Sequence, residues 1–214
     1  LKNLFELRKT KDRGLLISAT GTGKTYLSAF DVKNVNPEKM LFTAHRKTIL
    51  EKSKLTFENI IKDKKMAVYG ENGWENADYI FAMVQTLSRP EHLKNFSEDF
   101  FDYIIIDEVH HSGAKTYQAL INYFKPKFLF GMTATPERTD DFDVYWLFNH
   151  NIAYEIRLYD ALRENLLCPF HYFGISDISV DGEIINEKTS IKKLAADERV
   201  NHIIEKSRYY GYSG

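Results

Sequence analysis

Short, continuous apolar runs recur along the first two thirds of the chain, and segments with a different pattern separate them. Such runs, bounded by turn residues, are typical of strands that are buried on both faces of a parallel sheet. We expect six of these strands, at residues 14–17, 40–44, 66–69, 79–84, 103–106 and 128–132.

The segments between these runs carry apolar residues at helical spacing. Leu1, Leu4 and Phe5 predict the end of an amphipathic helix, and further helices are expected over residues 24–34, 49–57 and 114–124. Continuous apolar strands that alternate with amphipathic helices indicate an α/β fold. We therefore predict a parallel sheet with helices on both faces.

The pattern weakens after Arg138. We expect a last strand over residues 152–159 that leads into a helix over 160–167. Beyond these, the prediction is one further strand (170–173), a polar loop (181–190) and a helix (194–210). We therefore assign residues 1–167 to one domain, and we expect residues 168–214 to be a connector toward a domain beyond this chain.

A glycine-rich turn joins the first predicted strand to the helix that follows it. This is the sequence context of a phosphate-binding loop. Glycine allows the backbone to approach a phosphate closely, and the N–H groups of the helix start face the phosphate charge. The lysine would neutralise the β- and γ-phosphates, and the last threonine would hold Mg²⁺. The candidate nucleotide-binding residues are Thr20, Gly21, Thr22, Gly23, Lys24 and Thr25. The alternative is an ordinary turn.

An acidic pair, Asp107 and Glu108, follows the most β-branched run of the chain. We expect Asp107 to orient Mg²⁺ and Glu108 to polarise the attacking water as a general base. The alternative is that the two acids only begin a loop. Ligands of parallel α/β sheets bind at the carboxyl ends of the strands, where both motifs stand. The sequence therefore predicts that the lysine and the acidic pair share one site.

Composition narrows the class of protein. Hydrophobic residues make up 43% of the 214 residues and charged residues 28%, as in a globular domain. The net charge of −1 gives no overall basic signal for nucleic acid. No apolar run is long enough to span a membrane. A single cysteine, Cys168, excludes an internal disulfide, and we expect a reducing, cytoplasmic setting.

Three motifs in order resemble motifs I, II and III of superfamily-two helicases: SATGTGKT from Ser18, DEVH from Asp107 and TATP from Thr133. The DEVH form and the TATPER continuation are similar to the branch that holds type I and type III restriction motor subunits and excision-repair helicases. The resemblance covers about residues 1–167. It implies one RecA-like, P-loop motor domain that uses ATP and Mg²⁺ and acts on nucleic acid, DNA more than RNA.

The resemblance also implies roles for residues outside the nucleotide site. Arg46 follows the second strand and matches motif Ia, which contacts the nucleic-acid backbone, and a guanidinium can bridge two phosphate oxygens. Gln85 and Thr86 stand where the family has a further backbone contact. The alternatives are that Arg46 is an exposed residue at a helix start and that the other two only cap a helix. The residues expected to link hydrolysis to movement are His110, Thr133 and Thr135.

The chain departs from the family pattern at three points. Ser18 stands where Ala or Gly is usual, and the family's adenine-recognising glutamine segment and second motor domain are expected outside this chain. Because the second domain supplies arginine fingers, we expect weak hydrolysis by this chain alone. Two other functions stay open: a nucleotide-binding switch or scaffold that does not turn over, and a P-loop transferase. The intact Glu108 disfavours the switch, and TATP disfavours the transferase.

Overall fold

The computed structural model describes residues 1–109, 115–137, 143–169, 179–180, 183–184 and 197–211. The described residues divide into two compact units, residues 1–168 and 169–214.

The first unit is built on a seven-stranded sheet in which every neighbouring pair is parallel. The strand order is β3-β4-β2-β5-β6-β1-β7. After β1 the chain passes over two strand positions to β2 and reaches one edge of the sheet at β3. It then returns through β4, β5 and β6 and ends at β7, the other edge strand. The strands are β1 (Arg13–Ser18), β2 (Met40–Ala44), β3 (Met66–Val68), β4 (Tyr79–Met83), β5 (Tyr103–Asp107), β6 (Phe128–Thr133) and β7 (Ile152–Ile156).

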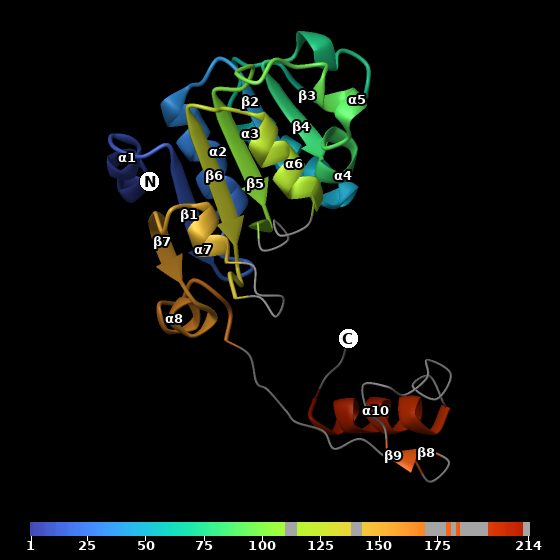
Figure 1. The fold of residues 1–214 in the computed structure, drawn as a ribbon. Helices are drawn as coiled ribbons and strands as arrows, with labels where there is room; N and C mark the ends of the chain where they lie inside the picture. Colours follow the sequence, from blue (N-terminus) through green and yellow to red (C-terminus); the bar gives the residue numbers. More distant parts are fainter. Residues whose placement is uncertain (110–114, 138–142, 170–178, 181–182, 185–196, 212–214) are drawn as a thin grey trace. The chain divides into compact units, whose positions relative to one another are not determined.

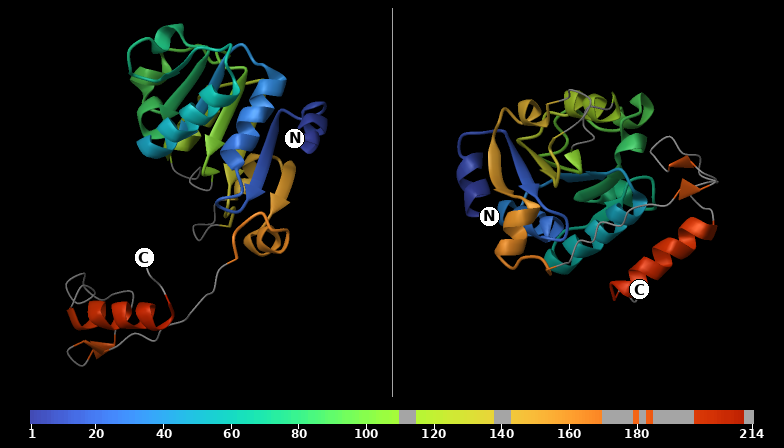
Figure 2. Two further views of the ribbon diagram at one scale, coloured as in Figure 1. Left: turned by 180° about the vertical axis from the view of Figure 1, so that it is seen from behind. Right: turned by 90° about the horizontal axis from the view of Figure 1, so that it is seen from below.

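Helices cover both faces of this sheet (Figures 1 and 2). Alternate side chains of each central strand enter two separate apolar cores, and strands β2, β5 and β6 are buried along their whole length. This is the physical reason for their continuous apolar sequence. The helices of the described part of this unit include α1 (Lys2–Arg8), α2 (Lys24–Val35), α3 (Lys47–Ile60), α4 (Val84–Leu87), α5 (Pro90–Leu93), α6 (Lys115–Tyr123), α7 (Val144–Leu147) and α8 (Leu158–Arg163), and η1 (Trp74–Asn76) is a 3₁₀ turn.

One core lies under helices α1, α2 and α3. It contains Leu4, Val32 and Phe57 from these helices and is filled by aromatic side chains, with the rings of Phe42 and Phe81 stacked at 5.4 Å between centroids. The other core lies under α4, α5, α6 and α7. The predicted α/β fold, with a parallel sheet and helices on both faces, is confirmed.

The structure corrects several predicted boundaries. Strand β4 ends at Met83, because Val84 begins the short helix α4. Strand β7 ends at Ile156, and α8 occupies Leu158–Arg163, so the predicted strand 152–159 was too long and the predicted helix 160–167 began and ended too late. Helix α7, whose Asp143 side chain accepts a hydrogen bond from the Trp146 N–H, was not predicted.

The second unit contains a short antiparallel pair, β8 (Ser179–Val180) and β9 (Glu183–Ile184), and the helix α10 (Asp197–Tyr209). Strand β9 lies within the segment predicted as a loop, so that prediction was wrong there. Helix α10 lies within the predicted helix 194–210. The predicted strand 170–173 lies outside the described residues.

Candidate nucleotide-binding site

The glycine-rich loop connects β1 to α2 at the carboxyl edge of the sheet. Gly21 and Gly23 have φ values of +87° and +85°, a left-handed conformation that side chains disfavour. Gly23 is the N-cap of α2, so Lys24 and Thr25 occupy the first turn of that helix. The start of α2 therefore presents N–H groups and the positive end of the helix dipole at this edge.

Hydrogen bonds within the loop hold its shape. The Thr22 hydroxyl donates to the carbonyl oxygen of Ala19 at 2.6 Å and lies 2.5 Å from the Ser18 hydroxyl. The Lys24 ammonium donates to the carbonyl oxygen of Ser18 at 2.9 Å. Ser18, the departure from the family pattern, thus contributes its hydroxyl to the loop's internal bonding.

The acidic pair lies at the carboxyl end of β5, which is separated from β1 by β6. Asp107 is the last residue of β5 and is 7% exposed, and its Oδ1 accepts a hydrogen bond from the Glu108 N–H at 3.0 Å. Glu108 has a φ of +52°, which is rare for a residue with a side chain. Such a conformation is often found at functional sites, where the surrounding structure maintains it.

A cavity of about 400 Å³ joins the loop to the acidic pair. Its lining includes Lys24 and Thr25 from the start of α2 together with Asp107 and Glu108 from the end of β5. These residues lie some eighty positions apart in the chain and meet because parallel strands end at one edge. The complete lining is Thr20, Gly21, Gly23, Lys24, Thr25, Tyr26, Ile49, Lys52, Ser53, Thr56, Asp107 and Glu108.

Burial shifts the pKa values of two ionisable groups in this cavity, Asp107 and Lys24. Burial and, to a lesser extent, the charge of Glu108 raise the pKa of Asp107 to about 6, although the hydrogen bond from the Glu108 N–H and the charge of Lys24 lower it. Burial lowers the pKa of Lys24, whereas Glu108 and Asp107 act to raise it. Each ionised group is thus only partly compensated by its neighbours.

The donor chemistry fits a hard divalent cation. The cavity combines the Thr25 hydroxyl with the Asp107 carboxylate, and oxygen ligands of this kind suit Mg²⁺. Among the described residues, no cluster of three or more His, Cys, Asp or Glu side chains could hold a metal by themselves. Magnesium sites at phosphates commonly use one or two protein ligands and take the rest from phosphate and water.

The predicted residues outside the cavity lie at the same edge. Thr133 is buried at the end of β6, and its Oγ1 accepts a hydrogen bond from the Thr135 N–H at 3.2 Å. Because Met132 pairs in register with Asp107, Thr133 follows directly beyond the level of the acidic pair. His110 lies outside the described residues.

The predicted nucleic-acid contacts form a separate group. Arg46 is exposed and is the N-cap of α3, directly after β2. Gln85 is exposed in α4, directly after β4, and its Nε2 donates to the carbonyl oxygen of His45 at 3.2 Å. Thr86 follows and is half-buried. Because β2 and β4 are neighbours, this bond brings Gln85 beside the start of α3.

Sequence reasoning missed one side of the cavity. Tyr26 and the α3 residues Ile49, Lys52, Ser53 and Thr56 also line it. The four α3 positions have the i, i+3, i+4, i+7 spacing of a single helix face. That spacing was visible in the sequence, but which neighbour the face meets depends on how α2 and α3 pack.

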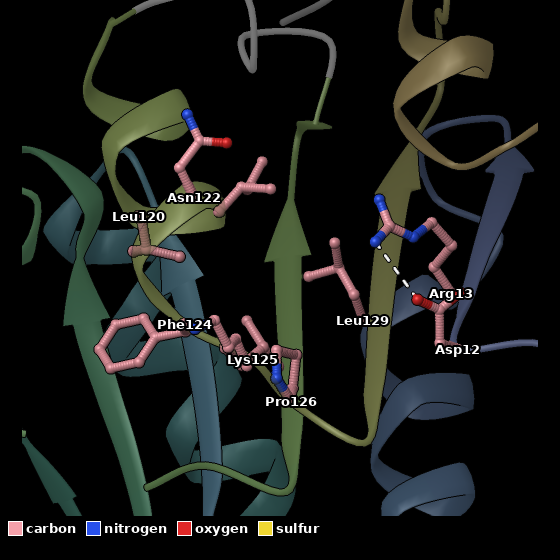
Figure 3. A pocket seen from close by; sticks show the side chains of 10 residues that line it. Asp12, Arg13, Leu120, Asn122, Phe124, Lys125, Pro126 and Leu129 are labelled. Carbon is pink, nitrogen blue, oxygen red and sulfur yellow. Dashed lines mark hydrogen bonds and ion pairs between the residues drawn. The ribbon is translucent and has the colours of Figure 1, made fainter. Parts of the chain in front are cut away.

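A second cavity, of about 350 Å³, lies at the opposite edge of the sheet (Figure 3). It is lined by residues at the starts of β1 and β6 and at the end of α6, among them Arg13, Leu129 and Phe124. The Arg13 guanidinium donates to Asp12 and to the carbonyl oxygen of Leu147. This cavity contains none of the motif residues.

The sheet, the loop and the acidic pair together define a P-loop domain of the RecA-like class. A family model described as "Type III restriction enzyme, res subunit" matches residues 1–138. The chain belongs to this family. The resemblance to superfamily-two helicases predicted from the three motifs is thereby confirmed.

Relatives and solved structures agree with this assignment. The chain is 28% identical to a type I restriction enzyme EcoAI endonuclease subunit of Escherichia coli, over 92% of this chain and 28% of that protein. It is 24% identical to a putative ATP-dependent helicase, IRC3, of Saccharomyces cerevisiae, over 88% of this chain and 30% of that protein. The chain thus spans less than a third of either relative.

A solved structure of the Type ISP restriction-modification enzyme LlaGI, a nuclease-deletion mutant with a DNA substrate mimic, has a similar fold. The TM-score is 0.61 at 20% identity, over 77% of this chain and 17% of that one. This likeness supports the fold.

Within the described part of the chain, no helix has the length and apolar character needed to cross a bilayer.

Proposed function

We propose that residues 1–167 are the ATP-binding motor domain of a helicase or translocase that acts on nucleic acid, with DNA as the preferred substrate. The observation that carries the proposal is the cavity shared by Lys24, Thr25, Asp107 and Glu108. A cation, a hydroxyl, a buried carboxylate and a second carboxylate around one space are the groups that phosphoryl transfer to water requires.

Each group has a defined role in this proposal. Lys24 exchanges its bond to the Ser18 carbonyl for the β- and γ-phosphates of ATP. Thr25 and Asp107 hold Mg²⁺, which neutralises charge on the β- and γ-phosphates when bound. Glu108 accepts the proton of the water that attacks the γ-phosphate. Thr133 and Thr135, at the end of the adjacent β6, connect this site to the rest of the motor.

Nucleic acid binds in this proposal along the strand ends beside the nucleotide. Arg46 and Gln85 are both exposed there, and Arg46 can bridge two phosphate oxygens. The preference for DNA is supported by the family, whose description refers to a restriction enzyme, and by the similarity to a type I restriction endonuclease subunit. A restriction motor subunit is the more specific form of the same proposal.

A second RecA-like domain completes the active site in this proposal, and residues 168–214 lead toward it. Arginine fingers of related P-loop enzymes accelerate hydrolysis by ~10³–10⁵-fold. We therefore expect the 214-residue chain to bind ATP weakly and to hydrolyse it slowly. Steady-state phosphate release equal to that of the full-length protein would contradict this.

The decisive experiment measures ATP turnover by the full-length protein with and without DNA, beside the Glu108→Gln variant. A motor requires strong stimulation by DNA and loss of turnover in the variant. Turnover that DNA and RNA leave unchanged would favour a nucleotide-binding switch or scaffold. Replacing DNA with RNA of the same sequence tests the substrate preference, and added salt should weaken stimulation because phosphate contacts release counterions.

A further inference from the structure

One face of α3 forms a wall of the nucleotide cavity. Ile49, Lys52, Ser53 and Thr56 line the same space as the phosphate loop and the acidic pair. These positions follow each other at three- and four-residue steps, so they share one side of the helix. The wall facing the phosphate loop therefore carries one cation, Lys52, and two hydroxyls.

Lys52 differs from the other lysines of α3 in its partners. Lys47 pairs with Glu51 and Glu71, and Lys54 pairs with Glu58. For Lys52, the described residues provide no carboxylate within ion-pair distance. Lys52 is an exposed residue, and its ammonium sits on a flexible four-carbon stem, so it is available to an anion that enters the cavity.

The charges of the cavity leave a place for a second cation. Lys24 is the one cation of the phosphate loop, and Asp107 and Glu108 bring two negative charges to the same space. A nucleoside triphosphate with one Mg²⁺ brings further negative charge. Lys52 lines the same cavity as Asp107 and Glu108. The terminal phosphate must lie in this cavity near Glu108 if water activated by that carboxylate is to attack it.

We propose that Lys52 is a binding residue for the terminal phosphate of the nucleoside triphosphate, supplied by α3 rather than by the phosphate loop. The proposal rests on the proposed function and adds a specificity determinant: Lys52 favours the triphosphate over the diphosphate. An exposed lysine contributes as a point charge, so arginine at this position retains the attraction.

The position of Lys52 in α3 also connects the two ligands. Arg46 caps the start of the same helix, six positions before Lys52, which corresponds to about 9 Å along a helix axis. A terminal phosphate held by Lys52 is thereby bound to the element that carries the proposed nucleic-acid contact.

The test measures the equilibrium affinities of the full-length protein for Mg²⁺-bound ADP and for a non-hydrolysable Mg²⁺-bound ATP analogue, by calorimetry. The variants are Lys52→Met, which keeps the length of the stem, Lys52→Arg, which keeps the charge, and Lys62→Met as a control for overall charge. Lys62 is exposed and follows the end of α3. Thermal unfolding of each variant checks that the fold is retained.

We expect Lys52→Met to weaken the ATP analogue on the order of 10-fold, as for a lost hydrogen bond to a charged group, and ADP by less than about 2-fold. Lys52→Arg and Lys62→Met should bind both nucleotides as the wild type does. Equal weakening of ADP and the analogue, or no weakening of either, would overturn the proposal. Full-length wild-type protein that bound neither nucleotide would instead refute the proposed function itself.

Discussion

The ammonium group of Lys24 donates a hydrogen bond of 2.9 Å to the carbonyl oxygen of Ser18, the residue that ends strand β1. The lysine of the helix start is thus folded back over its own loop. Burial lowers the pKa of Lys24, which means that the charge is held at a cost in this environment. An incoming phosphate replaces the carbonyl oxygen with a stronger, charged partner.

Replacing Lys24 with methionine should therefore affect binding far more than folding. We expect Lys24→Met to lower ATP turnover by the full-length protein on the order of 100-fold or more, as is typical when one charge-stabilising donor is removed. The free energy of unfolding should change by less than about 1 kcal/mol. Steady-state kinetics measures the loss of turnover, and urea unfolding measures the change in stability. A Lys24→Met variant that turned over ATP as the wild type does would contradict the role of Lys24 in phosphate binding.

The buried carboxylate of Asp107 makes stability depend on pH. Its pKa of about 6 in the folded protein lies above the ordinary value of 3.8, so the folded state binds this proton more tightly than the unfolded state. The contribution of the protonated Asp107 to the free energy of unfolding is fully present below about pH 4, and it is lost as the pH rises through 6. The shift corresponds to a loss of about 3 kcal/mol across this range.

The variant Asp107→Asn carries no ionisable group at this position. In metal-free buffer without nucleotide, its free energy of unfolding relative to the wild type should rise between pH 4 and pH 7 by up to about 3 kcal/mol. Urea unfolding at several pH values measures this difference, from which the titrating groups that do not interact with Asp107 cancel. The same variant should lose ATP turnover. A constant difference between the two proteins across this range would show that the carboxylate is not held at a raised pKa.

A second buried carboxylate, Asp31, is satisfied by partners from two other elements. Arg8 of α1 donates to both of its oxygens, at 2.5 and 2.9 Å, and the Tyr103 hydroxyl donates to Oδ2 at 2.6 Å. Asp31 is 1% exposed. Because removal of one partner of such a pair leaves an uncompensated buried charge, we expect Arg8→Met to destabilise the fold by about 3–5 kcal/mol.

A double-mutant cycle separates the pair from the charge left behind. Tyr103→Phe removes one hydrogen bond to a charged acceptor and should cost about 1.5–3 kcal/mol. Arg8→Met combined with Asp31→Leu should recover much of the loss of Arg8→Met alone, since no buried charge remains. Chemical denaturation of the wild type, Arg8→Met, Asp31→Leu and the double variant gives the coupling energy between the two residues. Purely additive effects would refute a direct interaction between Arg8 and Asp31.

The parts of the fold that the sequence predicted well are those whose pattern follows directly from burial. Strand β5 is buried on both faces, so its residues are all apolar until Asp107, and the strand ends where the first charge stands. Strand β7 is an edge strand with exposed residues at Ile152, Tyr154 and Glu155, and its mixed pattern gave no clear end. Short helices such as α7 depend on a local cap at Asp143 rather than on periodicity.

The candidate site divides in the same way. Lys24 and Asp107 could be brought together from the sequence because both follow buried parallel strands, whose ends must lie at one edge. The position of Lys52 in the cavity lining could not be predicted from the sequence. Periodicity shows which residues share a helix face, but it does not show which neighbouring element that face meets. Tertiary packing of α3 beside α2 decides this, and the network around Asp31 likewise arises only when α1, α2 and β5 meet.

Arg46 offers a last prediction, because it is the N-cap of α3 and is exposed beside Gln85. If it contacts one nucleic-acid phosphate, Arg46→Ala should weaken DNA binding by the full-length protein to a similar extent on any sequence. The slope of log affinity against log salt should fall by about one. Fluorescence anisotropy over a range of salt concentrations measures both quantities. Arg163→Ala, which removes an exposed arginine from α8, is the matched control and should leave the slope unchanged. An unchanged slope in Arg46→Ala would remove this residue from the nucleic-acid contact and leave the helix start as an ordinary exposed cap.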